Sequence, residues 1–260
     1  MIEPIGTQLW ADARWRDGWR IQSRQDAESS RLLSRRGRVV CRGSLEACER
    51  ALDAVQPTAV AADHLIILLH GLGRTRRSLA RLDRALVEAG FTTARLDYPS
   101  TRGSIQDHAA TVADLLDHVP TPQKLSFVSH SLGGLVTRQL LGYDAPWRSA
   151  VYRIVMIAPP NRGASLAAAL DKGNLVRGIL GPSYGQIAEG FATTLPVPDV
   201  PFAIFAGEVP GVPGDGLVTV DETRLDGMSE HHVVPAIHTF LMNHPAVIQG
   251  AISFLSAAPD

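Results

Sequence analysis

Apolar runs alternate along most of the chain with segments whose apolar residues recur at helical spacing. A continuous apolar run is typical of a strand buried on both faces, as in a parallel sheet. Six strands are predicted, at Leu65–Leu69, Phe91–Leu96, Leu125–Val128, Val151–Ile157, Phe202–Ala206 and His232–Val234. Helices are predicted at Ser78–Ala89, Ser104–Leu116 and Leu135–Leu141. This alternation predicts an α/β fold with a mostly parallel central sheet and helices on both faces.

Residues 1–60 precede this pattern and are predicted to form an N-terminal extension of strands and a helix, followed by a main domain over 61–260. Short strands are predicted at Trp19–Gln22, Arg31–Leu33 and Arg38–Cys41, and a helix begins at Ser44. These strands are either the first antiparallel strands of the sheet or a small appended module. The tryptophans Trp10, Trp15 and Trp19 are either packing anchors or line an entrance to a site.

A stretch rich in glycine and aliphatic residues, at about 161–200, interrupts the main domain. Its composition predicts a small cap insertion of short helices that can move. The alternative is a static surface excursion.

Composition agrees with a single globular domain, since 45% of the 260 residues are hydrophobic and 20% are charged. The formal net charge of −1 predicts no nucleic-acid partner. No stretch approaches the roughly 20 apolar residues of a transmembrane helix. The first 20 residues lack the apolar core of a signal peptide, so a cytoplasmic location is expected. The two cysteines, Cys41 and Cys48, are expected to be buried, reduced thiols.

The segment Ser129–Gly134 carries the strongest chemical signal. It follows a predicted strand and precedes a predicted helix, which is the setting of a nucleophile elbow with Ser131 at its apex. Ser129 stands where such an elbow usually has its first glycine, and this small residue is expected to fit. The alternative is a serine in an ordinary strand–helix turn.

The loop that begins with His70-Gly71 follows the first buried strand of the main domain. In acyl-transfer enzymes of this architecture, that loop and the residue after the nucleophile each supply one backbone N–H to an oxyanion hole. The expected donors are therefore Leu72 and Leu132. His70 itself is expected to be structural.

An acid and a base follow in the order expected of such a site. Asp215 lies in a glycine-flanked loop after the strand Phe202–Ala206, and His238 lies between the last strand and the last helix. Other residues compete for both roles. They are Asp199, Asp221 and Asp226 for the acid, and His231, His232 and His244 for the base.

From Leu65 to Leu255 the chain resembles the α/β-hydrolases of the bacterial lipase and esterase branch. The resemblance is carried by Leu69–Gly73, His130–Gly134, Ala158–Gly163, Asp215–Val218 and His238–Phe240. It implies a serine hydrolase of carboxylic esters with the triad Ser131, Asp215 and His238, acting on a small-molecule or lipid ester without metal or organic cofactor. An acyl thioesterase or lipid deacylase with the same triad, or a non-catalytic binding protein of this fold, remain alternatives. The oligomeric state is left open.

Overall fold

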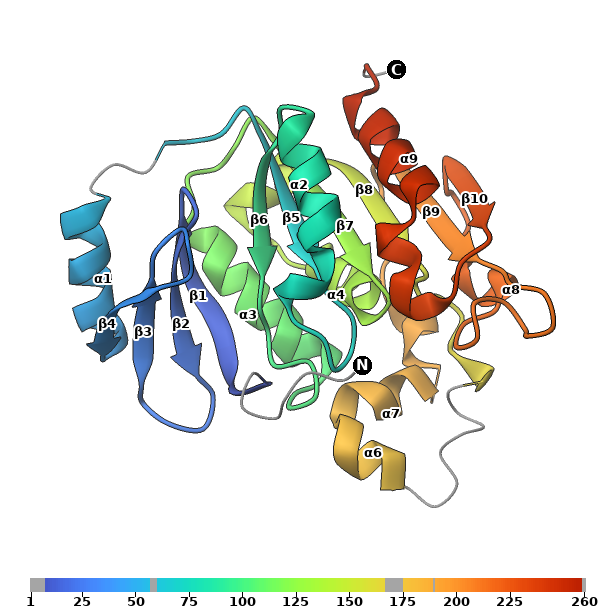
Figure 1. Ribbon diagram of the computed structural model, residues 1–260, viewed down its shortest axis with the longest axis horizontal. Helices are drawn as coiled ribbons and strands as arrows, with labels where there is room; N and C mark the ends of the chain where they lie inside the picture. The colour runs from blue at the N-terminus through green and yellow to red at the C-terminus, as the bar shows by residue number, and fades with distance from the viewer. Residues whose placement is uncertain (1–7, 57–59, 167–174, 189, 259–260) are drawn as a thin grey trace.

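The computed structural model describes residues 8–56, 60–166, 175–188 and 190–258, and their strands form two separate sheets (Figure 1). The larger sheet has six strands, all parallel, in the order β10-β9-β8-β7-β5-β6. They are β5 (His64–Leu69), β6 (Thr92–Leu96), β7 (Lys124–His130), β8 (Val151–Ile157), β9 (Phe202–Gly207) and β10 (Glu230–Val234). The predicted α/β fold is thus confirmed.

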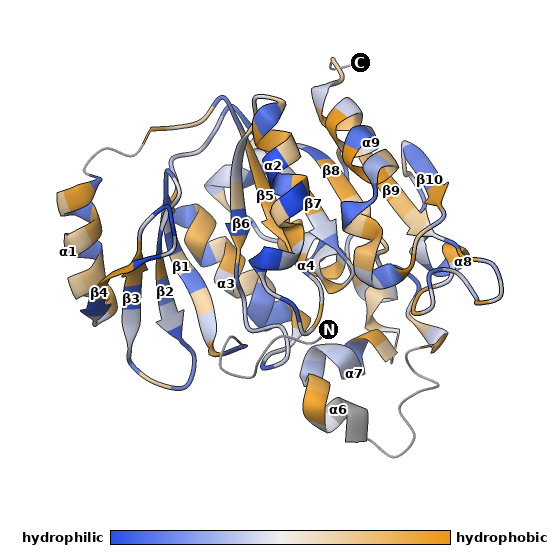
Figure 2. Cartoon of the chain, in the orientation of Figure 1, coloured by the Kyte–Doolittle hydropathy of each residue, from blue (hydrophilic) through white to orange (hydrophobic). Residues whose placement is uncertain are grey.

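Successive side chains of the central strands face two apolar layers, one on each side of the sheet. In β5, Ile66 and Leu68 belong to one layer, whereas Leu65 and Ile67 belong to the other. The first layer is covered by α2 (Ala80–Glu88) and α9 (Pro245–Ser256), and the second by α3 (Ile105–Asp117) and α4 (Leu132–Leu140). Figure 2 shows the apolar strands in the middle of the molecule and polar positions on the outside of α2.

Short helices complete the main domain. They are η2 (Arg76–Leu79), η3 (Pro146–Ala150), η4 (Phe191–Thr194), α8 (Val220–Thr223) and η5 (His238–Asn243). The longer helix α3 begins as predicted, because the Ser104 hydroxyl accepts from the Asp107 N–H while the Asp107 carboxylate accepts from the Ser104 N–H.

The first strands form a sheet of their own. It is antiparallel, in the order β1-β2-β3-β4, and the helix α1 packs against it. Its elements are β1 (Trp10–Arg16), β2 (Trp19–Arg24), β3 (Ser30–Leu33), β4 (Val39–Gly43) and α1 (Leu45–Val55). We call these elements the N-terminal module, and they realise the second of the two arrangements considered for the extension. Strand β1 was not predicted. Cys48 is buried as expected, but Cys41 is only half-buried, because it lies on the edge strand β4.

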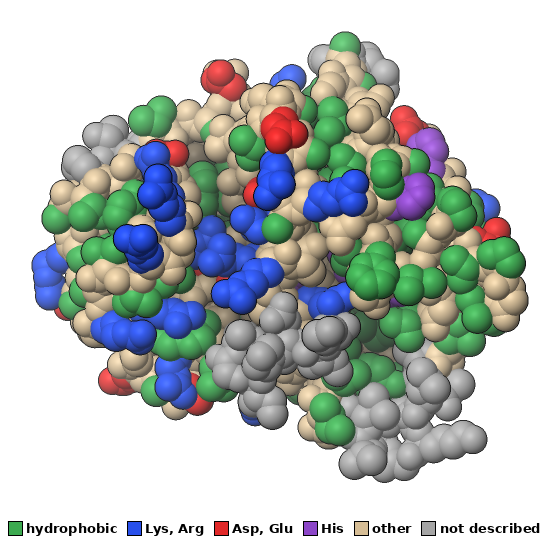
Figure 3. All heavy atoms as spheres, in the orientation of Figure 1, with side chains coloured by type: hydrophobic (Ala, Val, Ile, Leu, Met, Phe, Trp, Pro, Cys, Tyr) green, Lys and Arg blue, Asp and Glu red, His purple; other side chains and the backbone are tan. Residues whose placement is uncertain are grey.

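Buried charged groups join the N-terminal module to β6. Asp12 accepts from Arg20 at 3.0 Å and from the Asp97 N–H at 2.8 Å. The Asp97 carboxylate in turn accepts from Gln22 at 3.0 Å and from Arg76 Nε at 2.8 Å. Basic side chains, with Lys and Arg drawn in one colour, gather on this face of the molecule in Figure 3. The junction is therefore held by hydrogen bonds of defined geometry between charged and polar groups, rather than by apolar contact alone.

Part of the predicted insertion, residues 167–174, lies outside the described residues. The rest includes α6 (Leu175–Leu180) and α7 (Pro182–Ala188). Helix α7 is fastened to the start of α3, because Ser183 Oγ donates to Gly103 O at 2.8 Å and Gln186 Oε1 accepts from the Ile105 N–H at 2.7 Å. Within the described ranges, no helix is both long enough and apolar enough to cross a membrane.

Candidate active site

Ser131 lies at the sharp turn between β7 and α4. Its backbone has φ 54° and ψ −122°, a conformation that is rare for residues other than glycine. Such a conformation costs about 1–3 kcal/mol and persists only where surrounding contacts enforce it. Here the Ser131 N–H donates to Ile157 O at 2.8 Å, and its carbonyl accepts from the Gly134 N–H at 2.9 Å. The turn thus carries the serine side chain beyond the carboxyl end of the sheet.

Small residues beside Ser131 let α4 approach the strands closely. A Cβ at Gly133 would lie 2.6 Å from Leu69 O, and one at Gly134 would lie 2.9 Å from Pro159 Cβ. Ser129, the departure from the usual glycine, is fully buried, and its hydroxyl donates to Val155 O at 3.3 Å. The serine is therefore accommodated by a bond to the neighbouring strand.

His238 and Asp215 meet Ser131 at the carboxyl end of the larger sheet. His238 Nε2 lies 3.0 Å from Ser131 Oγ, and His238 Nδ1 lies 2.7 Å from Asp215 Oδ2. A carboxylate only accepts, so Nδ1 carries the proton and Nε2 is free to accept from the serine hydroxyl. The other carboxylate oxygen of Asp215 accepts from the Leu217 and Val218 N–H groups at 3.0 and 2.8 Å.

The competing acids and bases are engaged elsewhere. Asp199, Asp221 and Asp226 form ion pairs with Arg148, Arg224 and Arg162, respectively. The three histidines make local contacts: His231 with Thr223, His232 with Glu230, and His244 with the Ala246 N–H. Of all these candidates, the structure brings only Asp215 and His238 to Ser131 among the described residues.

The loop after β5 passes directly beside the serine. A Cβ at Gly71 would lie 3.1 Å from Ser131 Cβ, so this loop and the turn are in contact. Leu72 follows Gly71, and Leu132 is the first residue of α4, where helical N–H groups have no partner within the helix. His70 is buried, stacks on Tyr98 with ring centroids 4.3 Å apart, and accepts the Tyr98 hydroxyl on its carbonyl oxygen.

Comparison with known families gives one match. A family model described as a domain of unknown function, DUF7379, matches residues 46–181, which is more than half of the chain. The chain belongs to this family. A comparison with curated proteins finds no match.

Solved structures similar to this DUF7379 protein share its fold. Lipase BlEst2 from Bacillus licheniformis, in its mature form, is 19% identical with a TM-score of 0.63, covering 77% of this chain and 95% of that one. The metagenomic carboxyl esterase MGS0156 is 15% identical (TM-score 0.56, 76% of each chain). An esterase from Thermogutta terrifontis is 15% identical (TM-score 0.52, 75% of this chain and 90% of that one). These likenesses show that the chain has the α/β-hydrolase fold, as the resemblance implied.

Sequence patterns did not single out His130 in this DUF7379 chain. Its Nε2 lies 3.1 Å from the His238 carbonyl oxygen, and the two rings are 4.9 Å apart. Burial, with the positive charge that His238 can carry nearby, holds the pKa of His130 well below its ordinary value. The ring is therefore neutral, and its Nε2–H donates to the backbone of the candidate base. Its position beside Ser131 in the sequence was the available signal.

A second group without a sequence signal joins Gln8, just before the first strand of the N-terminal module, to the loop after β5. Gln8 Nε2 donates to Arg74 O at 2.7 Å, and Gln8 Oε1 accepts from Ser100 Oγ at 3.1 Å. Ser100 Oγ accepts in turn from the Gly73 N–H at 3.0 Å. Arg74 also reaches the His238 segment, because its Nη2 donates to Thr239 O at 3.1 Å.

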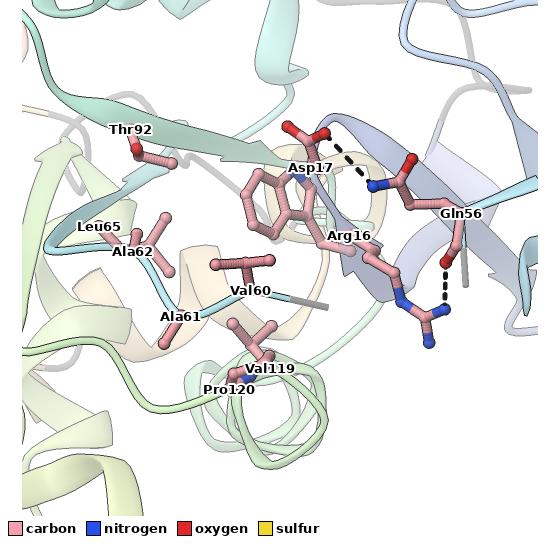
Figure 4. Close-up of a pocket in the computed structure, with 11 residues that line it drawn as sticks. Arg16, Asp17, Gln56, Val60, Ala61, Ala62, Leu65, Thr92, Val119 and Pro120 are labelled. Atoms are coloured by element: carbon pink, nitrogen blue, oxygen red, sulfur yellow. Dashed lines mark hydrogen bonds between the residues drawn. The ribbon is translucent and has the colours of Figure 1, made fainter. Parts of the chain in front are cut away.

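A separate cavity of about 290 Å³ lies at the amino ends of the strands, the end of the sheet opposite to Ser131 (Figure 4). It adjoins Leu65 and Thr92 at the amino ends of β5 and β6, whereas Ser131 follows the carboxyl end of β7. Trp15 lines this cavity, so it does not line an entrance to the candidate site. Among the described residues, no group of three or more His, Cys, Asp or Glu side chains is arranged to hold a metal ion.

Proposed function

We propose that this DUF7379 protein is a serine hydrolase that cleaves carboxylic esters. The observation that supports this most directly is the continuous chain of contacts from Ser131 Oγ through the His238 ring to the Asp215 carboxylate. Esterases and lipases of the same fold add support. Each of the three groups has the partner that its role in acyl transfer requires.

In the proposed reaction, His238 Nε2 takes the proton of Ser131 as the hydroxyl oxygen attacks the acyl carbonyl. The N–H groups of Leu72 and Leu132 donate to the tetrahedral oxyanion, and a donor of this kind typically contributes about 3–4 kcal/mol. The imidazolium, stabilised by Asp215, then gives its proton to the departing alcohol. Water, deprotonated by His238, releases the acyl group by the reverse sequence.

We further propose that the insertion at about 161–200 acts as a cap over the acyl group. Its described part docks on the start of α3 through Ser183 and Gln186. The cap is modest in size, so short-to-medium acyl esters are the expected substrates.

Hydrolysis of p-nitrophenyl esters from acetate to palmitate, measured for the wild type and Ser131→Ala, tests the proposal. We expect Ser131→Ala to lose activity by roughly 10³-fold or more, because the nucleophile is absent. Ser129→Ala is the matched control, since this neighbouring serine only bonds to Val155 O. It should keep activity within a few-fold.

Two results would contradict the proposal: equal activity in the wild type and Ser131→Ala, or a folded wild type that is inactive on every ester. In the latter case, acyl thioesters are the substrates to compare next on the same preparation.

A further inference from the structure

Gln8 is a buried amide whose side-chain partners among the described residues all lie in the main domain. It comes just before β1 and is 3% exposed. Its donor goes to Arg74 O, and its acceptor serves the Ser100 hydroxyl and, at 3.3 Å, the Thr101 N–H. Burying an amide costs free energy unless it is hydrogen-bonded. Gln8 at this buried position therefore depends on these partners rather than on apolar packing.

These bonds hold the loop after β5 at two consecutive residues. Gln8 binds the carbonyl of Arg74 directly, and through Ser100, which is fully buried, it fixes the N–H of Gly73. Gly73 has φ 65°, a left-handed conformation that lets the chain turn sharply. Leu72, whose N–H is the proposed oxyanion donor, immediately precedes these two anchored residues.

We propose that Gln8 is a positioning residue for the oxyanion loop, so that the N-terminal module contributes to catalysis as well as to the fold. The inference rests on the proposed function. An oxyanion donor acts only if it is already aimed when the charge develops, and a displacement of about 1 Å can cost about 10²-fold in rate. The Gln8 amide limits that displacement at the two residues that follow Leu72.

Gln22 provides a matched control. It is also a glutamine, is 2% exposed, and also joins the module to the main domain. Its amide donates to the Asp97 carboxylate and accepts from Arg31, and neither is a partner of Gln8. Asp97 also accepts from the Arg76 N–H at 2.8 Å, so Arg76 is left out of the comparison. Loss of Gln22 therefore weakens docking of the module without releasing the loop.

The experiment compares Gln8→Ala, Gln8→Glu and Gln22→Ala with the wild type on p-nitrophenyl butyrate. In both Gln8 variants we expect kcat to fall at least tenfold with KM within threefold, and inhibition by a trifluoromethyl ketone to weaken by a similar factor. Gln8→Glu keeps the side-chain length but cannot donate to Arg74 O. If Gln8→Ala does not fold, the test is made with Gln8→Glu alone. Gln22→Ala should keep kcat within twofold even if its Tm falls.

Amide hydrogen exchange across residues 71–74, which exclude the Arg76 N–H held by Asp97, gives a readout that does not depend on activity. Exchange in this segment should become at least tenfold faster in the Gln8 variants and stay unchanged in Gln22→Ala. The proposal is overturned if the Gln8 variants keep wild-type kcat and exchange, or if Gln22→Ala changes both to the same extent. If the wild type hydrolyses no ester, the proposed function fails, and the exchange result alone decides whether Gln8 holds the loop.

Discussion

At the scale of single residues, the site depends on one tautomer of His238. Asp215 fixes it, because its Oδ2 accepts from Nδ1 at 2.7 Å while its Oδ1 is held by two backbone N–H groups. The backbone adds a further tie, since the His238 N–H donates to the Asp215 carbonyl at 3.0 Å. The ring therefore has little freedom to turn its proton toward Ser131.

Asp215→Asn tests this arrangement. The amide keeps the size of the carboxylate but can present an N–H to His238 Nδ1, which then favours the opposite tautomer. We expect kcat on a p-nitrophenyl ester to fall by about 10³–10⁴-fold, with the Tm little changed, because the change is nearly isosteric.

The control is Asp226→Asn at an exposed ion pair with Arg162, which should leave kcat unchanged. If Asp215→Asn retained more than a tenth of the wild-type kcat, Asp215 would not be the group that orients His238.

Residues with local sequence signals could be predicted, and those defined by distant partners could not. Ser131, Asp215 and His238 stand in recognisable turns and in a known chain order, so the sequence alone predicts that they lie close together. Gln8 has no such context, because its partners Arg74 and Ser100 lie 66 and 92 residues away. Its role appears only when the loop after β5 and the N-terminal module are seen together.

At the scale of elements, the close approach of α4 to β5 sets the height of Ser131 above the sheet. Gly133 makes this approach possible, since its Cα faces the last carbonyl groups of β5 and the following loop. The contact is with backbone, which cannot rotate away as a side chain can.

Gly133→Ala should therefore destabilise the fold by about 2–3 kcal/mol, as overpacking against a rigid neighbour does. It should also lower kcat, because Ser131 immediately precedes α4 and Leu132 is its first residue. Urea unfolding together with ester hydrolysis measures the two effects.

Gly178→Ala in α6 is the control, because a Cβ there would have nothing within 4 Å. That change should leave the free energy of unfolding equal or raise it by up to about 1 kcal/mol. Equal unfolding free energies for Gly133→Ala and the wild type would show that α4 can shift at no cost.

The strand β1 shows where element prediction failed. Its register is interrupted between Asp12 and Arg14, which breaks the alternation that identifies a strand. Its buried side chains include Asp12, a charged residue that sequence patterns place at the surface. The burial of Asp12 follows from its bond to the Asp97 N–H at the end of β6, so the information lies in the docked partner rather than in the segment itself.

At the scale of the whole molecule, several histidines are enclosed as neutral rings, and this has a consequence for acid stability. Burial lowers the pKa of His108 to about 4, with His70 adding to the effect, and its ring packs against Tyr98. In the unfolded chain the same group titrates near 6.5. The unfolded state therefore binds the proton first as the pH falls.

His108 should thus contribute full stability above about pH 6.5 and lose it progressively down to about pH 4, a change of about 3 kcal/mol. Urea unfolding at pH 7.5 and pH 4.5 measures this loss. In His108→Gln the difference between the two pH values should shrink by most of that amount. An identical difference in the variant and the wild type would assign the acid sensitivity to other groups.

The contact between Ser131 and His238 joins residues 107 positions apart in the chain. In the sheet, the strands β8 and β9 lie between β7, which precedes Ser131, and β10, which precedes His238. During synthesis, the elbow at Ser131 can be complete while its base has not yet been translated. A chain that ends before residue 238 carries the serine in a finished turn and still lacks its proposed general base. Under the proposed function, hydrolytic turnover therefore requires the C-terminal segment and reports the arrival of that segment rather than formation of the turn at Ser131.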